Sequence, residues 1–172
     1  MSRLRIYLAK PMTGRTGHDL LTEAFNAQNL AREWDVQVFD PVMYEDVPNT
    51  TEPVKASPKD LGAYWQRDKE LIRASHVLID QWGEAKSEGT AHEIGYARYH
   101  LWKPVIRVYP GLNVSVARLE DDVIASNLAF AFFEAVNRFG TPWKRLKWRA
   151  QLLNRCLLNY LKIRLLFLFD WV

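Results

Sequence analysis

The chain has 172 residues, of which 48% are hydrophobic and 25% are charged, a composition typical of one ordinary globular domain. Its single cysteine, Cys156, cannot form an internal disulfide and has no cysteine or histidine beside it at ligand spacing, which argues against a disulfide scaffold or a zinc site. The N-terminus lacks the long apolar stretch of a secretory signal, so we expect a cytoplasmic protein.

Strand and helix patterns alternate along most of the chain. Short β-prone runs predict strands at residues 4–9, 36–39, 76–80 and 104–109, and helical periodicity predicts helices at 18–34, 57–75, 90–101 and about 120–139. The alternation predicts an α/β fold, with a flavodoxin- or Rossmann-like parallel sheet of four to five strands and helices on both faces. No convincing fifth strand is evident.

The end of the chain has a different character. From Gly140 to Val172 seven basic residues stand against one acid, a charge of 7 − 1 = +6, which leaves 3 − 6 = −3 for the remainder of a chain of net charge +3. Leucines recur there at helical spacing beside the basic residues. We therefore predict an α/β domain over residues 1–140 and a C-terminal helical extension, a basic amphipathic tail, over 141–172.

Three roles remain open for this tail. It packs on its own domain, joins subunits into a homo-oligomer, or lies peripherally in a membrane interface. The first two are favoured, because exposed apolar area of this size usually contacts protein. No stable nucleic-acid partner is expected, since a basic run alone is mostly a solvated face.

Ligands of open parallel sheets bind at the carboxyl ends of the strands. One such end leads into Ser87–Ala97, a turn of small residues that feeds a helix. Free N–H groups at the helix start, with the Ser87 hydroxyl, suit a phosphate or a sugar oxygen. Glu93, one turn further on, can face the same space, and a carboxylate beside a sugar can attack the anomeric carbon.

A structural interpretation competes with this one. Thr90 to Glu93 also matches a capping box, in which Thr90 caps the helix and Glu93 turns back to the N–H of the cap. Taken alone, the motif favours capping. Asp68 shifts the balance, because helical spacing puts its carboxylate on the apolar stripe of the preceding helix. Such a charge is either neutralised by a partner or lines a polar cavity.

Other side chains carry two interpretations each. Tyr7 alternates with apolar residues in the first strand, so its hydroxyl reaches the ligand or lies in the core. Asp80 ends its strand at the predicted site and either contacts ligand or caps the next turn. Trp82 stacks on a base or covers the core. The four histidines, His18, His76, His92 and His100, show no ligand spacing and are interpreted as structural.

Four segments together resemble the nucleoside 2-deoxyribosyltransferase-like family, which includes deoxyribosyltransferases and deoxynucleoside 5′-monophosphate N-glycosidases. The resemblance spans about Leu4 to Val108, and the Ser87–Ala97 segment is the most specific part of it. The segments are Ile6–Gly14, Trp65–Asp68, Ile79–Trp82 and Ser87–Ala97.

The resemblance implies a role for several residues. Glu93 matches the nucleophile, Tyr7 the tyrosine that positions it, and Asp68 the aspartate needed for leaving-base protonation or sugar contact. Ser87 and Gly89 match positions that hold a 5′-phosphate, and Lys10 stands where the family usually has glycine. The substrate-binding candidates of the sequence are Ser87, Gly89, Thr90, Asp80, Trp82, Lys10, Met12 and Gly14.

The leading hypothesis is therefore an N-glycosidic-bond hydrolase or deoxyribosyltransferase acting on a nucleoside or nucleoside 5′-monophosphate through a glycosyl-Glu93 intermediate. The alternative is a non-catalytic nucleotide-binding sensor of similar α/β fold. No metal-ligand cluster, Walker-type loop or dinucleotide fingerprint is found, so we expect no metal and no cofactor.

Overall fold

A computed structural model describes residues 3–55, 61–81, 87–109, 116–119, 122–125 and 127–141. The chain divides into two units, Met1–Phe139 and Gly140–Val172. All the helices and strands named below belong to the first unit. The predicted amphipathic character of the tail, and with it the predicted oligomer, lies outside the described residues.

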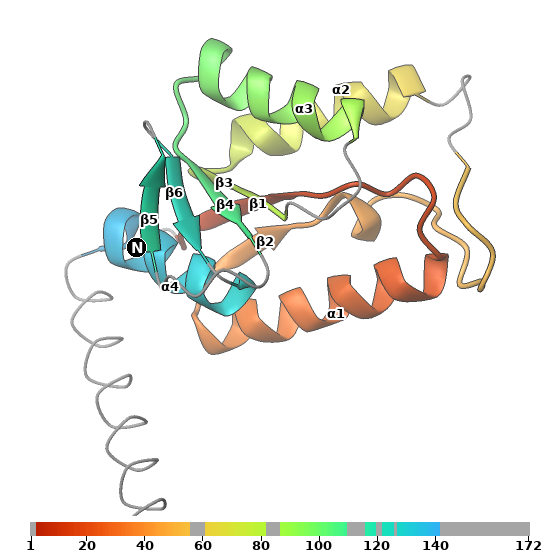
Figure 1. Cartoon of the computed structure of the whole chain (residues 1–172), viewed down its shortest axis with the longest axis horizontal. Coiled ribbons are helices and arrows are strands. Elements are labelled where there is room, and N and C mark those ends of the chain that lie inside the picture. The colour runs from red at the N-terminus through yellow and green to blue at the C-terminus, as the bar shows by residue number, and fades with distance from the viewer. Residues whose placement is uncertain are drawn as a thin grey trace, which may run out of the picture. The chain divides into compact units, whose positions relative to one another are not determined.

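The first unit is a doubly wound α/β fold (Figure 1). Its strands are β1 (Arg5–Ala9), β2 (Gln37–Phe39), β3 (Val77–Asp80), β4 (Val105–Val108), β5 (Val116–Leu119) and β6 (Asp122–Ala125). Its helices are α1 (Gly17–Glu33), the 3-10 helix η1 (Pro41–Met43), α2 (Leu61–Ala74), α3 (Glu88–Gly95), the π-helical turn η2 (Tyr96–His100) and α4 (Leu128–Phe139).

The strands form one sheet in the order β2-β1-β3-β4-β6-β5. Every neighbouring pair is parallel except β5 and β6, which are antiparallel. Helices α1 and α4 cover one face, while α2 and α3 cover the other (Figure 1). The predicted fold class, with a parallel sheet and helices on both faces, is confirmed.

The prediction for residues 120–139 is wrong in its first part. Asp122–Ala125 forms strand β6, which pairs with β4 on one side and β5 on the other, and the helix begins only at Leu128. A four-residue run is too short for its periodicity to distinguish a strand from a helical turn. Pairing with a distant strand decides between them, so the sheet has more strands than predicted.

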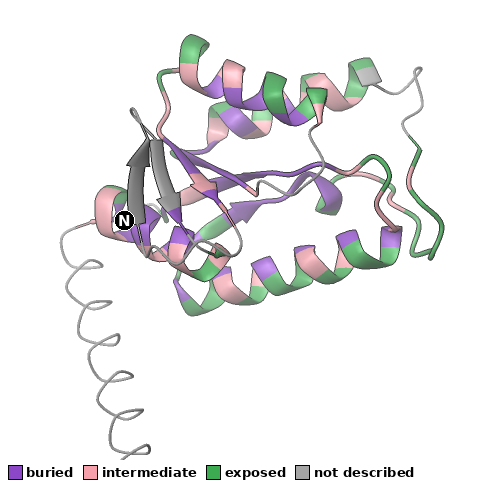
Figure 2. Ribbon diagram, viewed as in Figure 1, coloured by how far each residue is buried: buried purple, intermediate pink, exposed green. Residues whose placement is uncertain are grey.

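The core lies between the sheet and its two helical layers. The central strands are buried along their length, and the helices expose only their outer faces (Figure 2). In α1 the predicted stripe is buried as expected, at Leu20, Ala24, Ala27, Ala31 and the following Trp34. Tyr7 and Ala9 of β1 belong to the apolar cluster that includes Ile72 of α2 and Ile94 of α3. The alternation of the strand therefore turns Tyr7 toward the α2–α3 face.

No helix among the described residues combines the length and the apolar character that crossing a membrane requires.

The start of α1 is tied to the distant segment 48–54. Gly14 and His18 donate backbone hydrogen bonds to the carbonyls of Val54 and Thr50, at 3.0 Å each. A Cβ on Gly17 would lie 1.8 Å from the Pro48 carbonyl oxygen, well inside van der Waals contact. Only glycine at position 17 permits this close approach, which holds the 48–54 segment against the first loop.

Replacing Gly17 with alanine should therefore destabilise the protein, by about 1–3 kcal/mol, because backbone must move to relieve the clash. The matched control is Gly95→Ala, since a Cβ at Gly95 meets nothing within 4 Å and the residue has helical dihedral angles. Alanine there should be neutral or stabilise by up to about 1 kcal/mol. Chemical denaturation of both variants measures the difference, and equal midpoints would contradict the assigned close approach.

Candidate active site

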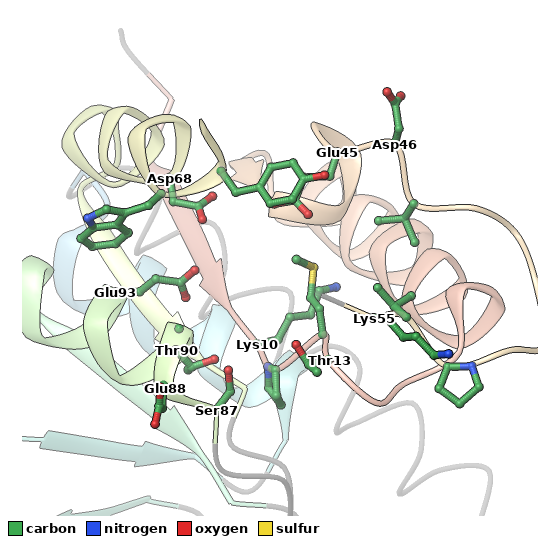
Figure 3. Close-up of a pocket in the computed structure, with 18 of the residues that line it drawn as sticks. Lys10, Thr13, Glu45, Asp46, Lys55, Asp68, Ser87, Glu88, Thr90 and Glu93 are labelled. Atoms are coloured by element: carbon green, nitrogen blue, oxygen red, sulfur yellow. The ribbon is translucent and has the colours of Figure 1, made fainter. Parts of the chain in front are cut away.

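A pocket of about 1150 Å³ opens at the carboxyl end of the sheet. Its wall comes from four stretches of chain: residues 10–13 after β1, 45–55 after η1, 62–68 of α2, and 87–93 at the start of α3 (Figure 3). In the strand order, the chain reverses its direction of winding between β1 and β3, which is where doubly wound folds bind their ligands. Residues 42–55 show neither helical nor strand period in the sequence, and the part of this segment from 45 to 55 contributes to the wall.

Glu93 projects from α3 into the pocket wall and is only 8% exposed. The Tyr7 hydroxyl donates a hydrogen bond of 2.9 Å to Glu93 Oε1. The second oxygen, Oε2, is buried without a hydrogen-bond partner within the described part of the chain. A buried carboxylate with one oxygen held and the other unsatisfied is a costly arrangement, and such arrangements concentrate at functional sites.

The capping-box interpretation of Thr90 and Glu93 is wrong. Helix α3 begins at Glu88, with Ser87 as its N-cap, so Thr90 lies inside the first turn and Glu93 lies well within the helix. The Glu93 side chain bonds to Tyr7 of β1 instead of to its own backbone. The Thr90 hydroxyl is buried and has no partner in the described structure.

Asp68 lies on α2 and is 9% exposed. Of the two outcomes left open by its sequence position, the polar cavity is correct, because its carboxylate lines the same pocket as Glu93 (Figure 3). Burial raises the pKa of Asp68 to about 6, against the smaller, opposing effects of the Tyr7 hydroxyl and the Arg67 charge. Tyr7 therefore interacts with two carboxylates from two different helices.

Burial and neighbouring charge also raise the pKa values of Glu93 and Tyr7. The pKa of Glu93 is raised well above its usual range, first by burial and then by the charge of Asp68, while the Tyr7 hydrogen bond opposes the shift. The pKa of Tyr7 is raised too, by burial and by the charges of Glu93 and Asp68. Tyr7 consequently stays protonated and acts as a hydrogen-bond donor to carboxylates.

Glu45 is a site residue that the sequence did not predict. It follows η1, is half-buried, and lines the pocket. Burial raises its pKa to about 7, and the charges of Asp68 and Asp40 act in the same direction while Arg67 opposes them. In the sequence, Glu45 is distinguished only by its place in a loop that follows a strand. That position predicts a ligand-binding region but does not identify a particular side chain.

The predicted residues at the start of α3 do line the pocket. Ser87, Gly89 and Thr90 all belong to its wall. Ser87 occupies the N-cap position without a side-chain capping bond. First-turn N–H groups of a helix favour oxygen ligands, so this part of the wall suits a sugar or phosphate oxygen.

The predicted residues of the first loop differ in their placement. Met12 lines the pocket, and so does Lys10, although the side chain of Lys10 is only 1% exposed. Lys10 Nζ lies 2.7 Å from Asp40 Oδ2 in a buried ion pair, and Asp40 Oδ1 accepts the Val42 N–H. Gly14 is absent from the described wall and instead makes a turn with φ of +83°.

Asp80 and Trp82 are not placed against the described pocket. Asp80 is fully buried at the end of β3, with Arg107 Nε 3.8 Å from its Oδ2. Burial raises the pKa of Asp80 to about 6, and the Arg107 charge lowers it. Trp82 lies outside the described residues.

Aromatic side chains form a further part of the wall. Trp65 and His92 both line the pocket, with ring centroids 6.3 Å apart. Helical spacing puts Trp65 on the apolar stripe of α2, and in the structure its side chain is partly exposed and lines the pocket. Among the described residues, no group of three or more His, Cys, Asp or Glu side chains is arranged to hold a metal ion.

The Lys10–Asp40 pair predicts a non-additive response to mutation. Lys10→Met should cost about 3–5 kcal/mol, because it leaves the Asp40 carboxylate buried without its cation. The double variant Lys10→Met/Asp40→Asn should recover more than half of that loss, since asparagine removes the charge and keeps an oxygen for the Val42 N–H. Urea denaturation of the single and double variants tests this, and additive losses would contradict it.

The raised pKa of Asp68 predicts that the effect of this residue on folding stability depends on pH. Because its pKa is raised on folding, the wild-type protein loses stability as pH rises from about 4 to about 6. Asp68→Asn should therefore be more stable than wild type by about 1–2 kcal/mol above pH 6, after allowance for solvent screening, and should show no such gain below pH 4. Thermal unfolding at pH 4 and pH 8 measures this difference. A variant less stable than wild type at pH 8 would show that the carboxylate is a net stabilising partner.

Comparison with known proteins finds structural similarity only. No protein-family model and no curated protein matches the chain. Among solved structures, the 2-deoxyribosyltransferase of Bacillus psychrosaccharolyticus is 26% identical, with a TM-score of 0.47 over 64% of this chain and 76% of that one. A conserved protein of Enterococcus faecalis V583 is 23% identical, with a TM-score of 0.47 over 64% and 65% of the two chains.

The CMP N-glycosidase of Clostridium botulinum is 17% identical, with a TM-score of 0.44 over 76% of this chain and 96% of that one. The structural matches thus include a 2-deoxyribosyltransferase and a CMP N-glycosidase, each with a TM-score under 0.5.

Proposed function

We propose that this chain cleaves or transfers the N-glycosidic bond of a nucleoside or nucleoside 5′-monophosphate through a covalent glycosyl ester on Glu93. The observation that carries the proposal is the Glu93 carboxylate in the pocket wall, with Oε1 held by Tyr7 and Oε2 without a partner among the described residues. The sequence resemblance of Ser87–Ala97 supports the same role.

The chemistry follows from this arrangement. Glu93 Oε2 attacks the anomeric carbon, and the electron pair of the carbon–nitrogen bond leaves with the base. Tyr7 orients the carboxylate through Oε1. Positive charge that develops on the sugar favours the ionised form of Glu93, as does the Tyr7 hydrogen bond, and both oppose the effect of burial. Asp68 assists departure of the base.

A second acceptor completes the reaction. If water attacks the glycosyl ester the enzyme is a hydrolase, and if a second base attacks it the enzyme is a transferase. Either way the configuration at the anomeric carbon is retained, because two displacements occur in succession.

Two features of the pocket have opposite effects on the binding of a 5′-phosphate. The start of α3, with Ser87 at the N-cap, favours a phosphate. Acidic side chains, however, outnumber lysines six to two in the wall, which disfavours an added dianion. The acidic residues are Glu45, Asp46, Glu52, Asp68, Glu88 and Glu93, and the lysines are Lys10 and Lys55.

The test is release of free base from a panel of deoxynucleosides and ribonucleosides, each with and without its 5′-phosphate, and each with and without a competing base. We expect release in the wild-type protein and a loss of about 10³-fold or more in Glu93→Gln, the scale seen when a nucleophile is removed. The matched control is Glu70→Gln, the same change at an exposed position of α2.

A sugar adduct on the acid-quenched chain, detected by intact mass spectrometry in wild type and absent from Glu93→Gln, would identify the covalent step. Saturable binding without base release, undiminished in Glu93→Gln, would instead identify a nucleotide sensor and end the catalytic proposal.

A further inference from the structure

We propose that Glu45 is a further catalytic residue of this site and delivers the proton that the departing base takes up. The inference rests on the proposed function, since a donor to the base matters only if a base leaves. Glu45 lies just after η1 and lines the pocket together with Glu93 and Asp68. Protonation of the leaving group is a task for a positioned side chain, typically worth about 10²–10⁴-fold in rate.

The first argument is the position of Glu45 relative to the nucleophile. In a displacement at the anomeric carbon, the nucleophile and the leaving base occupy opposite sides of that carbon. The donor to the base must therefore be more remote from Glu93 than the groups that hold Glu93 in place. Asp68 lies close to these groups, because its carboxylate interacts with the same Tyr7 hydroxyl as Glu93 does.

Glu45 meets this requirement. It comes from a different stretch of the wall than Asp68 and Glu93 (Figure 3). Its charge raises the pKa of Glu93 less than the charge of Asp68 does, so Glu45 is the more weakly coupled of the two to the nucleophile. The charge of Asp68 nevertheless raises the pKa of Glu45, so all three carboxylates belong to one cluster.

The second argument is the charge around Glu45. Burial, Asp68 and Asp40 raise its pKa to about 7, and Arg67 is the group that opposes them. A general acid works best with a pKa near the operating pH. Asp68, with a pKa of about 6, is largely ionised at neutral pH and so helps to keep Glu45 protonated. Asp68 then assists departure of the base through its charge.

The protons balance in both half-reactions. As the carbon–nitrogen bond breaks, the proton of the Glu45 carboxyl moves to the base nitrogen that receives the electron pair, and Glu45 becomes a carboxylate. In the second half, the acceptor forms a bond to the anomeric carbon, the Glu93 ester bond breaks, and Glu45 takes the proton of the water or of the incoming base. The site returns to its starting state.

The experiment compares leaving bases that differ in their need for a proton. One matched pair is 2′-deoxyguanosine and its N7-methyl derivative, whose base is already cationic. The other is 2′-deoxyuridine and 5-fluoro-2′-deoxyuridine, whose base is a better leaving group. Each is tested as the nucleoside and as the 5′-monophosphate, with spontaneous release subtracted, for wild type, Glu45→Gln, Glu93→Gln and the exposed control Glu70→Gln.

We expect Glu45→Gln to lower kcat/KM by about 10²–10⁴-fold on the unmodified member of a cleaved pair and by less than about 10-fold on the activated member. Glu93→Gln should lose activity on both members, and Glu70→Gln on neither. In wild type, kcat/KM on the unmodified substrate should fall above about pH 7, and this fall should be absent from Glu45→Gln.

An equal loss on both members of a pair would show that Glu45 only binds substrate, and would overturn the inference while leaving the proposed function intact. No loss on either member would overturn it as well. Base release by the wild-type protein from none of these compounds, and from none of the deoxynucleosides and ribonucleosides of the panel described above, would contradict the proposed function itself. Circular dichroism of Glu45→Gln checks that this near-isosteric change at a half-buried loop position leaves the fold intact.

Discussion

The hydrogen bond between Tyr7 and Glu93 is the contact on which the site depends. It joins the central strand β1 to helix α3, residues that are 86 positions apart in sequence. Tyr7 is fully buried, and its ring is packed between the sheet and the α2–α3 layer. This packing holds its hydroxyl in one position. The orientation of Glu93 is therefore set by the sheet, which is a more rigid support than a loop.

Burial makes the charges around this contact costly, and the Tyr7 hydrogen bond offsets only part of that cost. The carboxylates of Asp68 and Glu93 come from two helices and interact with one hydroxyl. Burial raises the pKa of each carboxylate. A site designed for stability alone would place neutral or apolar side chains here. The protein keeps carboxylates instead, as the proposed role of Glu93 requires, and proteins often lose stability where function demands such groups.

Much of the fold was predictable from local pattern. The apolar stripe of α1 and the alternation around Tyr7 followed from periodicity, because each depends on residues close in sequence. The parallel arrangement followed from the alternation of strands with helices along the chain. Strands β5 and β6 were missed, since their identity depends on pairing with β4 and with each other. The carboxylate on the apolar stripe of α2 was the one local anomaly that pointed to a polar cavity, and Asp68 does line one.

The candidate site was predictable only in part. Placing Tyr7, Asp68 and Glu93 together depended on the family resemblance as well as on pattern, and their catalytic roles remain proposals. The capping-box interpretation was wrong because a local sequence motif cannot show that Glu93 has a hydrogen-bond partner, Tyr7, on a distant strand. Glu45 was missed because residues 42–55 have no period, so nothing in the sequence distinguishes one acidic side chain there from its neighbours.

The buried pair of Lys10 and Asp40 has a consequence for how this chain can diverge. The two residues sit at the ends of neighbouring strands, and neither is accessible to solvent that could compensate a missing partner. A substitution at one position is therefore tolerated only if the residue at the other position changes too. Related chains are expected to keep both residues or to have replaced both. Lys10, which lines the pocket, is therefore expected to change only together with Asp40 behind it.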